Sequence, residues 1–270
     1  KFFEFLELYN FTIDENTSID QEMSVDPEML GRIFENLLAE INPETGESAR
    51  KSTGSFYTPR EIVEYMVDES IIQYLLTHTQ LWEIKVRALV SYDLEDDMEC
   101  PLELSEQQEV FDKILLMKIF DPACWSGAYP IWVLQKILYI MQTIDPTGTL
   151  WMEKKLSEIS DPIQRSMVRK SYEEKDINYL RKLTIIRDII YGCDIQPIAV
   201  ETSKLRCFLT LIVDEKVNTQ EDNYGIEPLP NLEFKFVCAN TLVPLKINTI
   251  DKINNDLVLW KQKKKLQSEI

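Results

Sequence analysis

The chain has 270 residues, of which 46 are acidic and 29 basic, and its formal net charge is −17. This length suggests one large or two modest domains, and an apolar fraction of 44% is ample for a core. No apolar run is long enough to predict a membrane span, and the first residues lack the pattern of a signal peptide. Because the chain does not begin with methionine, we expect it to be cut from a longer protein.

The charge is unevenly distributed. Residues 1–110 contain 7 basic and 25 acidic side chains, whereas residues 111–270 contain 22 basic and 21 acidic ones. The acidic half predicts a solvated helical surface, and an acidic chain is a poor partner for phosphate backbones. We therefore expect this chain alone to bind double-stranded DNA weakly or not at all.

The five cysteines form no Cys-x-x-Cys pair, and their odd number is typical of reduced, mostly buried thiols in a cytoplasmic protein. The only histidine, His78, lies far in sequence from any cysteine cluster. No zinc or other metal site is therefore expected, and neither is a Ser-His or Cys-His nucleophile.

Residues 1–117 are predicted to form an acidic helical domain. Asp26-Pro27 is a helix start, with an acid as cap, proline at the first position and apolar residues at helical spacing behind it. Thr58-Pro59 repeats this pattern and begins a second helix that we expect to reach about Leu76. The remainder is expected to be helical, with an acidic loop near Asp93–Glu99.

Residues 118–270 alternate strands and helices. The expected elements are, in chain order, strand 119–121, buried helix 127–143, a charged helical insertion within about 145–185, strand 189–194, helix 198–212, strand 234–237 and a basic-ended helix from about Ile250. A break within the insertion is expected near Asp161-Pro162. This alternation predicts an α/β fold with a parallel, doubly wound sheet. Three strands are too few for a finished sheet, so we expect the chain to stop within this second domain.

A polar residue stands at or just after the end of each predicted strand: Asp121, Asp194 and Asn240. In parallel sheets, ligands bind beyond the carboxyl ends of the strands. An acid at the first position could hold an ammonium group, an acid at the second suits ribose hydroxyls, and an amide at the third can bind the edge of a base. The alternatives are a generic tight turn after Asp121, a helix cap at Asp194 and a turn-forming asparagine at Asn240.

The segment Lys-Ile-Phe-Asp-Pro-Ala-Cys-Trp-Ser-Gly-Ala-Tyr-Pro at 118–130 closely resembles the cofactor motif of amino-methylating DNA methyltransferases. That motif is usually Asp-Pro-Ala-Cys-Gly-Ser-Gly-Ala-Phe. Gly-Ser-Phe-Tyr-Thr-Pro at 54–59 precedes it, and Cys-Asp-Ile-Gln-Pro-Ile-Ala-Val at 193–200 and Leu-Glu-Phe-Lys at 232–235 follow. Over about residues 26–245, this order resembles the N6-adenine methyltransferase region of type IIG or type IIS restriction-modification enzymes.

The resemblance implies a partial Rossmann-like methyltransferase sheet behind a helical domain, S-adenosylmethionine as cofactor, double-stranded DNA as the partner of the full-length protein, and the bacterial cytoplasm as location. It places the methionine end of the cofactor against the Tyr-Thr-Pro segment, its amino-acid portion at the first strand end and turn, and its nucleoside at the later strand ends. The implied cofactor-binding residues are Tyr57, Thr58, Pro59, Asp121, Ala123, Cys124, Ser126, Gly127, Asp194, Ile195 and Asn240.

Two departures from the family pattern stand out. The catalytic motif, Asn-Pro-Pro-Tyr or Asp-Pro-Pro-Tyr, is absent because the chain contains no Pro-Pro pair. No catalytic residue is therefore assigned, and we expect the chain alone to be inactive. Trp125 occupies a position where the family has glycine, and its indole could fill the cofactor pocket or require an unfavourable backbone angle. We expect it to weaken or abolish cofactor binding.

Two other interpretations remain open. Asp222 followed by Glu233-Phe234-Lys235 faintly matches the acid and Glu-x-Lys pattern of metal-dependent nucleases, although this pattern is very permissive. Alternatively, the chain is a degenerate, non-catalytic methyltransferase fold that serves as a scaffold or as a subunit of a DNA complex. Trp125 and the acidic half of the chain favour this second alternative.

Overall fold

The computed structural model describes residues 58–91, 100–213 and 231–243. The predicted helix after Asp26-Pro27, the loop at 93–99 and the tail helix from Ile250 lie outside these ranges. The elements are α4 (Arg60–His78), α5 (Glu83–Val90), α6 (Leu104–Leu116), β1 (Ile119–Asp121), α7 (Ala128–Ile144), α8 (Thr149–Ser157), α9 (Pro162–Glu173), α10 (Ile177–Thr184), the π-helical turn η2 (Ile185–Ile189), β2 (Ile190–Asp194), α11 (Pro197–Ile212) and β3 (Phe236–Cys238).

The three strands form a parallel sheet in the order β1-β2-β3, which confirms the predicted strand direction. Ile119 pairs with Ile190, and Gly192 pairs with Phe236. Gly192 permits this close pairing, because a Cβ atom there would lie 2.7 Å from the Phe236 ring and 3.0 Å from the Cys124 sulfur. The described residues therefore form a small α/β unit with an incomplete sheet.

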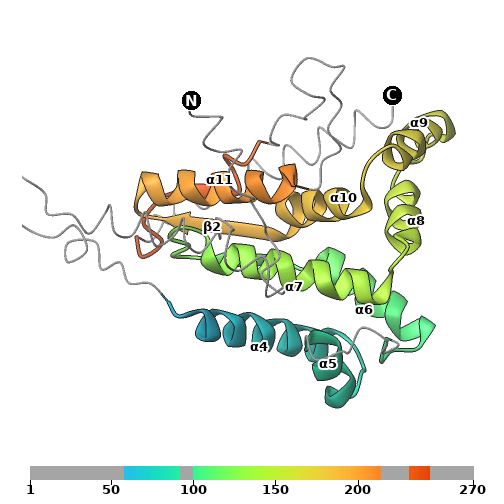
Figure 1. The fold of residues 1–270 in the computed structure, drawn as a ribbon, viewed down its shortest axis with the longest axis horizontal. Coiled ribbons are helices and arrows are strands. Elements are labelled where there is room, and N and C mark those ends of the chain that lie inside the picture. The colour runs from blue at the N-terminus through green and yellow to red at the C-terminus, as the bar shows by residue number, and fades with distance from the viewer. Residues whose placement is uncertain (1–57, 92–99, 214–230, 244–270) are drawn as a thin grey trace, which may run out of the picture.

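Helices α7 and α11 follow β1 and β2 and pack against each other and against the sheet (Figure 1). Helix α7 has no exposed residue, and Leu134, Ile137, Ile140 and Met141 are fully inaccessible. Helix α4 packs on the side of α7 that faces away from β2 in Figure 1, and its buried residues are Val63, Val67, Ile71, Ile72 and Leu75. The helices before residue 117 and the sheet after it therefore share one hydrophobic core.

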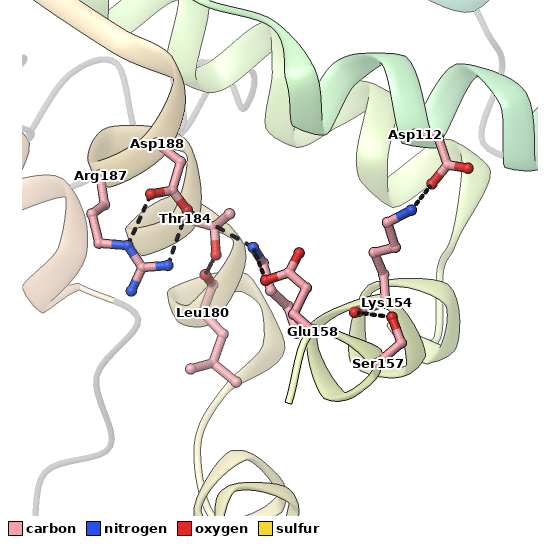
Figure 2. Close-up of polar contacts among 9 residues, drawn as sticks. Asp112, Lys154, Ser157, Glu158, Leu180, Thr184, Arg187 and Asp188 are labelled. Atoms are coloured by element: carbon pink, nitrogen blue, oxygen red, sulfur yellow. Dashed lines mark hydrogen bonds and ion pairs between the residues drawn. The ribbon is translucent and has the colours of Figure 1, made fainter. Parts of the chain in front are cut away.

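The predicted charged insertion consists of α8, α9 and α10, and a break at Asp161-Pro162 is confirmed. The Asp161 carboxylate accepts a hydrogen bond from the Ile163 amide at 2.8 Å and caps α9. The two ends of the insertion are joined by a buried ion pair in which Arg181 Nη2 lies 3.3 Å from Asp145 Oδ2. On the surface, Lys154 of α8 contacts Asp112 of α6 at 2.7 Å (Figure 2).

Two element boundaries differ from the predicted ones. Helix α4 begins at Arg60, and Pro59 occupies the N-cap position without any side-chain cap, so the prediction that Thr58 caps this helix was wrong. Pro59 instead caps through its carbonyl oxygen, which accepts from the Ile62 and Val63 amides. Strand β3 begins at Phe236, because Glu233–Lys235 form a turn in which the Asn231 side chain accepts from the Glu233 amide.

A buried ion pair joins α4 to α7. Lys136 is fully buried, and its ammonium lies 3.0 and 3.2 Å from the two carboxylate oxygens of Asp68 and 2.9 Å from the Val90 carbonyl oxygen. Removing one partner of a buried pair leaves an uncompensated charge, whereas removing one partner of an exposed pair costs little.

Replacing Asp68 by alanine should lower the free energy of unfolding by about 2–3 kcal/mol, because Lys136 is left charged and buried. The matched control is Asp112→Ala, which removes the partner of the half-exposed Lys154 from another helix and should cost less than about 1 kcal/mol. Urea unfolding of both variants measures the difference, and equal losses would contradict a dominant role for burial.

Candidate functional site

The polar strand ends lie together at the carboxyl edge of the sheet. Asp121 pairs in register with Gly192, and Asp194 pairs with Cys238, two residues before Asn240. Helices α7 and α11 begin at this same edge, toward which the β2 arrow points in Figure 1. The fold therefore brings the three polar strand-end residues, Asp121, Asp194 and Asn240, into one region, as expected for parallel strands.

The turn between β1 and α7 is held tightly against its neighbours. The Cys124 amide donates to the Cys193 carbonyl oxygen at 2.9 Å, and the Gly127 amide donates to the Cys124 carbonyl oxygen at 2.7 Å. Gly127 has a φ of +86°, and a Cβ atom there would lie 3.0 Å from the Ser203 hydroxyl. Glycine is thus required at position 127 both by its backbone angle and by the approach of α11.

Trp125 is the one non-glycine residue with a positive φ among the described ranges, at +47°. Its amide donates to Asp194 Oδ2 at 2.8 Å, and its carbonyl oxygen accepts from the Ser203 hydroxyl at 2.9 Å. The indole nitrogen is buried and has no hydrogen-bond partner in the described structure. Of the two effects considered for Trp125 from sequence, the unfavourable backbone angle is therefore present in the structure.

Asp121 has one carboxylate oxygen in use and one free. Oδ1 accepts from the Ala123 amide at 3.1 Å, whereas Oδ2 is buried without a partner in the described part of the chain. Burial raises the pKa of Asp121, and the nearby negative charge of Asp194 raises this pKa further. A buried carboxylate oxygen that has no hydrogen-bond partner and lies near a second negative charge is suited to accept a hydrogen bond from a cationic donor.

Asp194 is only 7% exposed, and each of its carboxylate oxygens accepts a backbone hydrogen bond. Oδ2 accepts from the Trp125 amide, and Oδ1 accepts from the Gln196 amide at 2.8 Å, just before α11. The alternative considered from sequence, a helix cap at Asp194, was wrong, because the N-cap of α11 is Gln196 and no side chain caps this helix. Ile195, which follows it, is 60% exposed at the edge of the site.

Asn240 forms a turn, which is the alternative role considered for it from sequence. Its side-chain oxygen accepts from the Leu242 amide at 3.0 Å. The neighbouring Thr241 hydroxyl donates to the Pro122 carbonyl oxygen at 3.1 Å, and the Ala239 amide donates to the Asp194 carbonyl oxygen at 2.9 Å. These bonds fix the segment after β3 against the β1–α7 turn.

The remaining predicted residues have diverse environments. Tyr57 lies outside the described residues, Thr58 is half-buried and Pro59 is exposed. Ala123 is exposed, whereas Cys124 and Ser126 are buried. Burial raises the pKa of Cys124 to about 12, which makes its thiol a poor nucleophile.

Helix α4 is anchored beside the start of α7. The Arg60 guanidinium lies 5.0 Å from the centre of the Trp132 ring, and the Tyr129 hydroxyl contacts the Met66 sulfur at 3.1 Å. The beginning of α4, and with it Thr58, is therefore on the side of α7 where the turn lies. The structure places no hydrogen bond between Thr58 and the turn among the contacts it describes.

Sequence reasoning missed two residues of α11. The Ser203 hydroxyl donates to the Trp125 carbonyl oxygen, and Arg206, which is 6% exposed, donates to the Ser126 carbonyl oxygen at 2.9 Å. Both side chains hold the turn from the neighbouring helix. No local sequence pattern marks this pair, because both partners are carbonyl oxygens that lie about 80 residues earlier in the chain.

No metal site is formed in the described ranges, where no three His, Cys, Asp or Glu side chains come together suitably. Asp222 of the nuclease-like pattern lies outside those ranges. Glu233 is in a turn, where it contacts Lys204 at 3.0 Å. Among the described residues, no helix has the length and apolar character needed to cross a membrane.

The fold and the site define a small parallel α/β unit with its polar groups beyond the carboxyl ends of the strands. No protein-family model matches the chain. Over 245 residues it is 29% identical to a protein of Methanocaldococcus jannaschii named "putative type II restriction enzyme and methyltransferase". The similarity covers 88% of this chain but 18% of that protein, so the chain spans less than a fifth of its relative's length.

Replacing Trp125 by glycine should give a more stable protein than replacing it by alanine, by about 1 kcal/mol. Both variants lose the indole, and they differ in whether the residue tolerates the positive φ. Urea unfolding of the two variants measures this difference directly. Equal stability would indicate that the backbone at position 125 is not held in the left-handed region.

The Asp121→Asn variant should change how stability depends on pH. Because the pKa of Asp121 is raised in the fold above its ordinary 3.8, the folded state binds the extra proton more tightly. The stability contributed by protonated Asp121 is fully present below the ordinary pKa of 3.8, and it is lost as the pH rises through the raised pKa of the folded state. Between pH 3 and pH 7, the free energy of unfolding of the variant should rise relative to that of the native protein. A difference between the two proteins that does not change with pH would contradict this.

Proposed function

We propose that the chain is the S-adenosylmethionine-binding part of a site-specific DNA adenine-N6 methyltransferase in a restriction-modification system of type IIG or type IIS. The observation that carries the proposal is the position of Asp121 and Asp194 at the ends of neighbouring strands, where both carboxylates accept hydrogen bonds from amides of the turn at 122–127. The printed name of the Methanocaldococcus jannaschii relative, which includes both a type II restriction enzyme and a methyltransferase, supports the same function.

The side chains fit such a cofactor in part. The orphaned Oδ2 of Asp121 would accept from its ammonium group, which would also relieve the repulsion from Asp194. Asp194 has lone pairs left for ribose hydroxyls, because a carboxylate offers about four acceptor sites and two are used. Ile195 is exposed for contact with an apolar ring, and the amide of Asn240 retains its NH₂ donors.

Trp125 fits the cofactor poorly. The family resemblance places glycine at this position, whereas here a half-buried indole lies at the centre of the turn. The remaining residues that we assign to the cofactor are Tyr57, Thr58, Pro59, Ala123, Cys124, Ser126 and Gly127. S-adenosylmethionine supplies a methyl group on a sulfonium centre, and the role of these residues would be to bind and orient it.

No residue of this chain is assigned to the transfer itself, because the Pro-Pro catalytic motif is absent from its sequence. In the proposed full-length enzyme, that motif would hold a flipped adenine. The net charge of −17 is unfavourable for a phosphate backbone, so the DNA contacts would be supplied outside this chain. We propose a cytoplasmic enzyme with residues 1–117 as its helical domain and residues 118–270 as the first part of its methyltransferase domain.

The second candidate function is a non-catalytic scaffold or subunit of a DNA complex, and the strained Trp125 favours it. The two functions differ in whether the site can be restored by a single change. A cofactor pocket obstructed only at position 125 should bind once the indole is removed, whereas a degenerate pocket should not.

Calorimetric titration with S-adenosylmethionine and S-adenosylhomocysteine should show weak or no binding by the native chain and an affinity at least about tenfold higher for Trp125→Gly, equivalent to about 1.4 kcal/mol. Trp82→Gly, which removes the 77% exposed indole before α5, is the control and should behave as the native chain does. Adding Asp121→Ala to Trp125→Gly should abolish the gain. Failure of Trp125→Gly to bind would favour the scaffold, and equal micromolar binding by both proteins would remove Trp125 as an obstacle.

A further inference from the structure

The candidate cofactor site has two halves that differ in exposure. The first half is the end of β1 with the turn at 122–127, and the second half is formed by the ends of β2 and β3. In the first half, Asp121 Oδ2 and Trp125 Nε1 are both buried and lack a hydrogen-bond partner in the described part of the chain. In the second half, Ile195 is 60% exposed and Asn240 is also exposed. A ligand that approaches from solvent therefore meets the second half first.

The first half is closed by a turn that its neighbours hold in place. The Trp125 carbonyl oxygen accepts from the Ser203 hydroxyl, and the Ser126 carbonyl oxygen accepts from the Arg206 guanidinium. Trp125 supplies the only aromatic side chain of the turn. Because these bonds fix the backbone, a ligand reaches Asp121 Oδ2 only if side chains move, and the indole is the bulkiest of those in the turn.

The second half is already formed without a ligand. The Asn240 side-chain oxygen accepts from the Leu242 amide at 3.0 Å, and the Ala239 amide donates to the Asp194 carbonyl oxygen at 2.9 Å. These bonds leave the NH₂ group of Asn240 without a partner among the contacts of the described residues. A site that is held in this way loses little conformational entropy when a ligand binds.

The groups of the second half suit a neutral nucleoside. The Ile195 side chain can contact an apolar ring, and the NH₂ group of Asn240 can donate to a ring nitrogen. Asp194 can accept from ribose hydroxyls, because each of its oxygens accepts one amide and has a further lone pair. A phosphate group, in contrast, would lie near two carboxylates, and the negative charge of Asp194 already raises the pKa of Asp121.

We propose that the native chain binds a neutral purine nucleoside, such as adenosine, in preference to S-adenosylmethionine and to nucleotides. This preference rests on the proposed function, which assigns the ribose and the ring to the second half and the amino-acid portion to the first half. An amino-acid portion would extend the ligand toward the buried Asp121 Oδ2. Its charged groups would lose water without gaining partners, whereas a nucleoside keeps every contact of the second half.

Calorimetric titration of the native chain with adenosine, adenosine 5′-monophosphate and S-adenosylmethionine tests this preference. Adenosine should bind with a dissociation constant below about 1 mM, and at least about tenfold more tightly than either of the other two compounds. Asn240→Asp keeps the oxygen that accepts from Leu242 but loses the NH₂ donor, so it should weaken adenosine binding by about tenfold. Asn231→Asp is the matched control, because Asn231 likewise accepts from an amide in a turn, that of Glu233, and it should bind as the native chain does.

A second variant tests the apolar contact without adding a charge. Ile195→Ser should weaken adenosine binding several-fold, because the aliphatic surface that meets the ring is lost. Ile195 is 60% exposed, so the substitution should leave the fold intact. Leu205→Ser, which removes a 44% exposed aliphatic side chain from α11, is the control and should not change the affinity.

The proposal is overturned if the native chain shows no adenosine binding at about 1 mM, or if either competing compound binds as tightly as adenosine. It is also overturned if neither Asn240→Asp nor Ile195→Ser weakens adenosine binding, or if Asn231→Asp weakens it equally, because the nucleoside would then lie elsewhere.

The proposed cofactor role is tested separately by Trp125→Gly. If the native chain binds adenosine as expected but Trp125→Gly does not bind S-adenosylmethionine, the nucleoside preference stands and the cofactor role is lost. If Trp125→Gly binds S-adenosylmethionine but the native chain does not bind adenosine, the cofactor role stands and the nucleoside preference is lost.

Discussion

The Asp194 carboxylate is the interaction on which the rest of the site depends. It lies at the end of the central strand, and its two oxygens accept from Trp125 in one crossover turn and from Gln196 in the next. Hydrogen bonds from backbone amides to a buried carboxylate are strong. Because Asp194 is only 7% exposed, its carboxylate has little access to water as an alternative hydrogen-bond donor. One side chain therefore sets the relative positions of β1, α7 and α11.

Two buried ion pairs extend this constraint to the rest of the chain. Lys136 with Asp68 ties α4 to α7, and Arg181 with Asp145 closes the three-helix insertion at its base. The insertion therefore lengthens the first crossover without moving β2 away from β1. Buried pairs tolerate little displacement, because each charge depends on its partner for compensation. The long interval between Asp121 and Asp194 in sequence is in this way compatible with their close approach in space.

The sequence predicted three parallel strands, because apolar runs that end in polar residues alternate with helical patterns along the chain. The break in the insertion near Asp161-Pro162 was also predicted from the sequence. The start of α4 could not be predicted in the same way, because Thr58-Pro59 fits two helix registers and packing on α7 selects the later one. Ser203 and Arg206 were missed for a related reason: their partners are carbonyl oxygens about 80 residues away, and no local pattern records such contacts.

In the candidate cofactor site, the hydrogen bonds that hold the β1–α7 turn require a backbone angle that is unfavourable for the residue at position 125. The amide of Trp125 must point at Asp194 to join the two turns, and this requires a left-handed backbone that glycine adopts more easily. The Ser203 hydroxyl, the Gly127 contact and the Cys124 amide all hold the turn in that conformation. The surrounding contacts, rather than the residue at 125, therefore determine the shape of the turn. An indole at that position changes what fills the space beyond the strands while the backbone donors and the free oxygen of Asp121 stay in place.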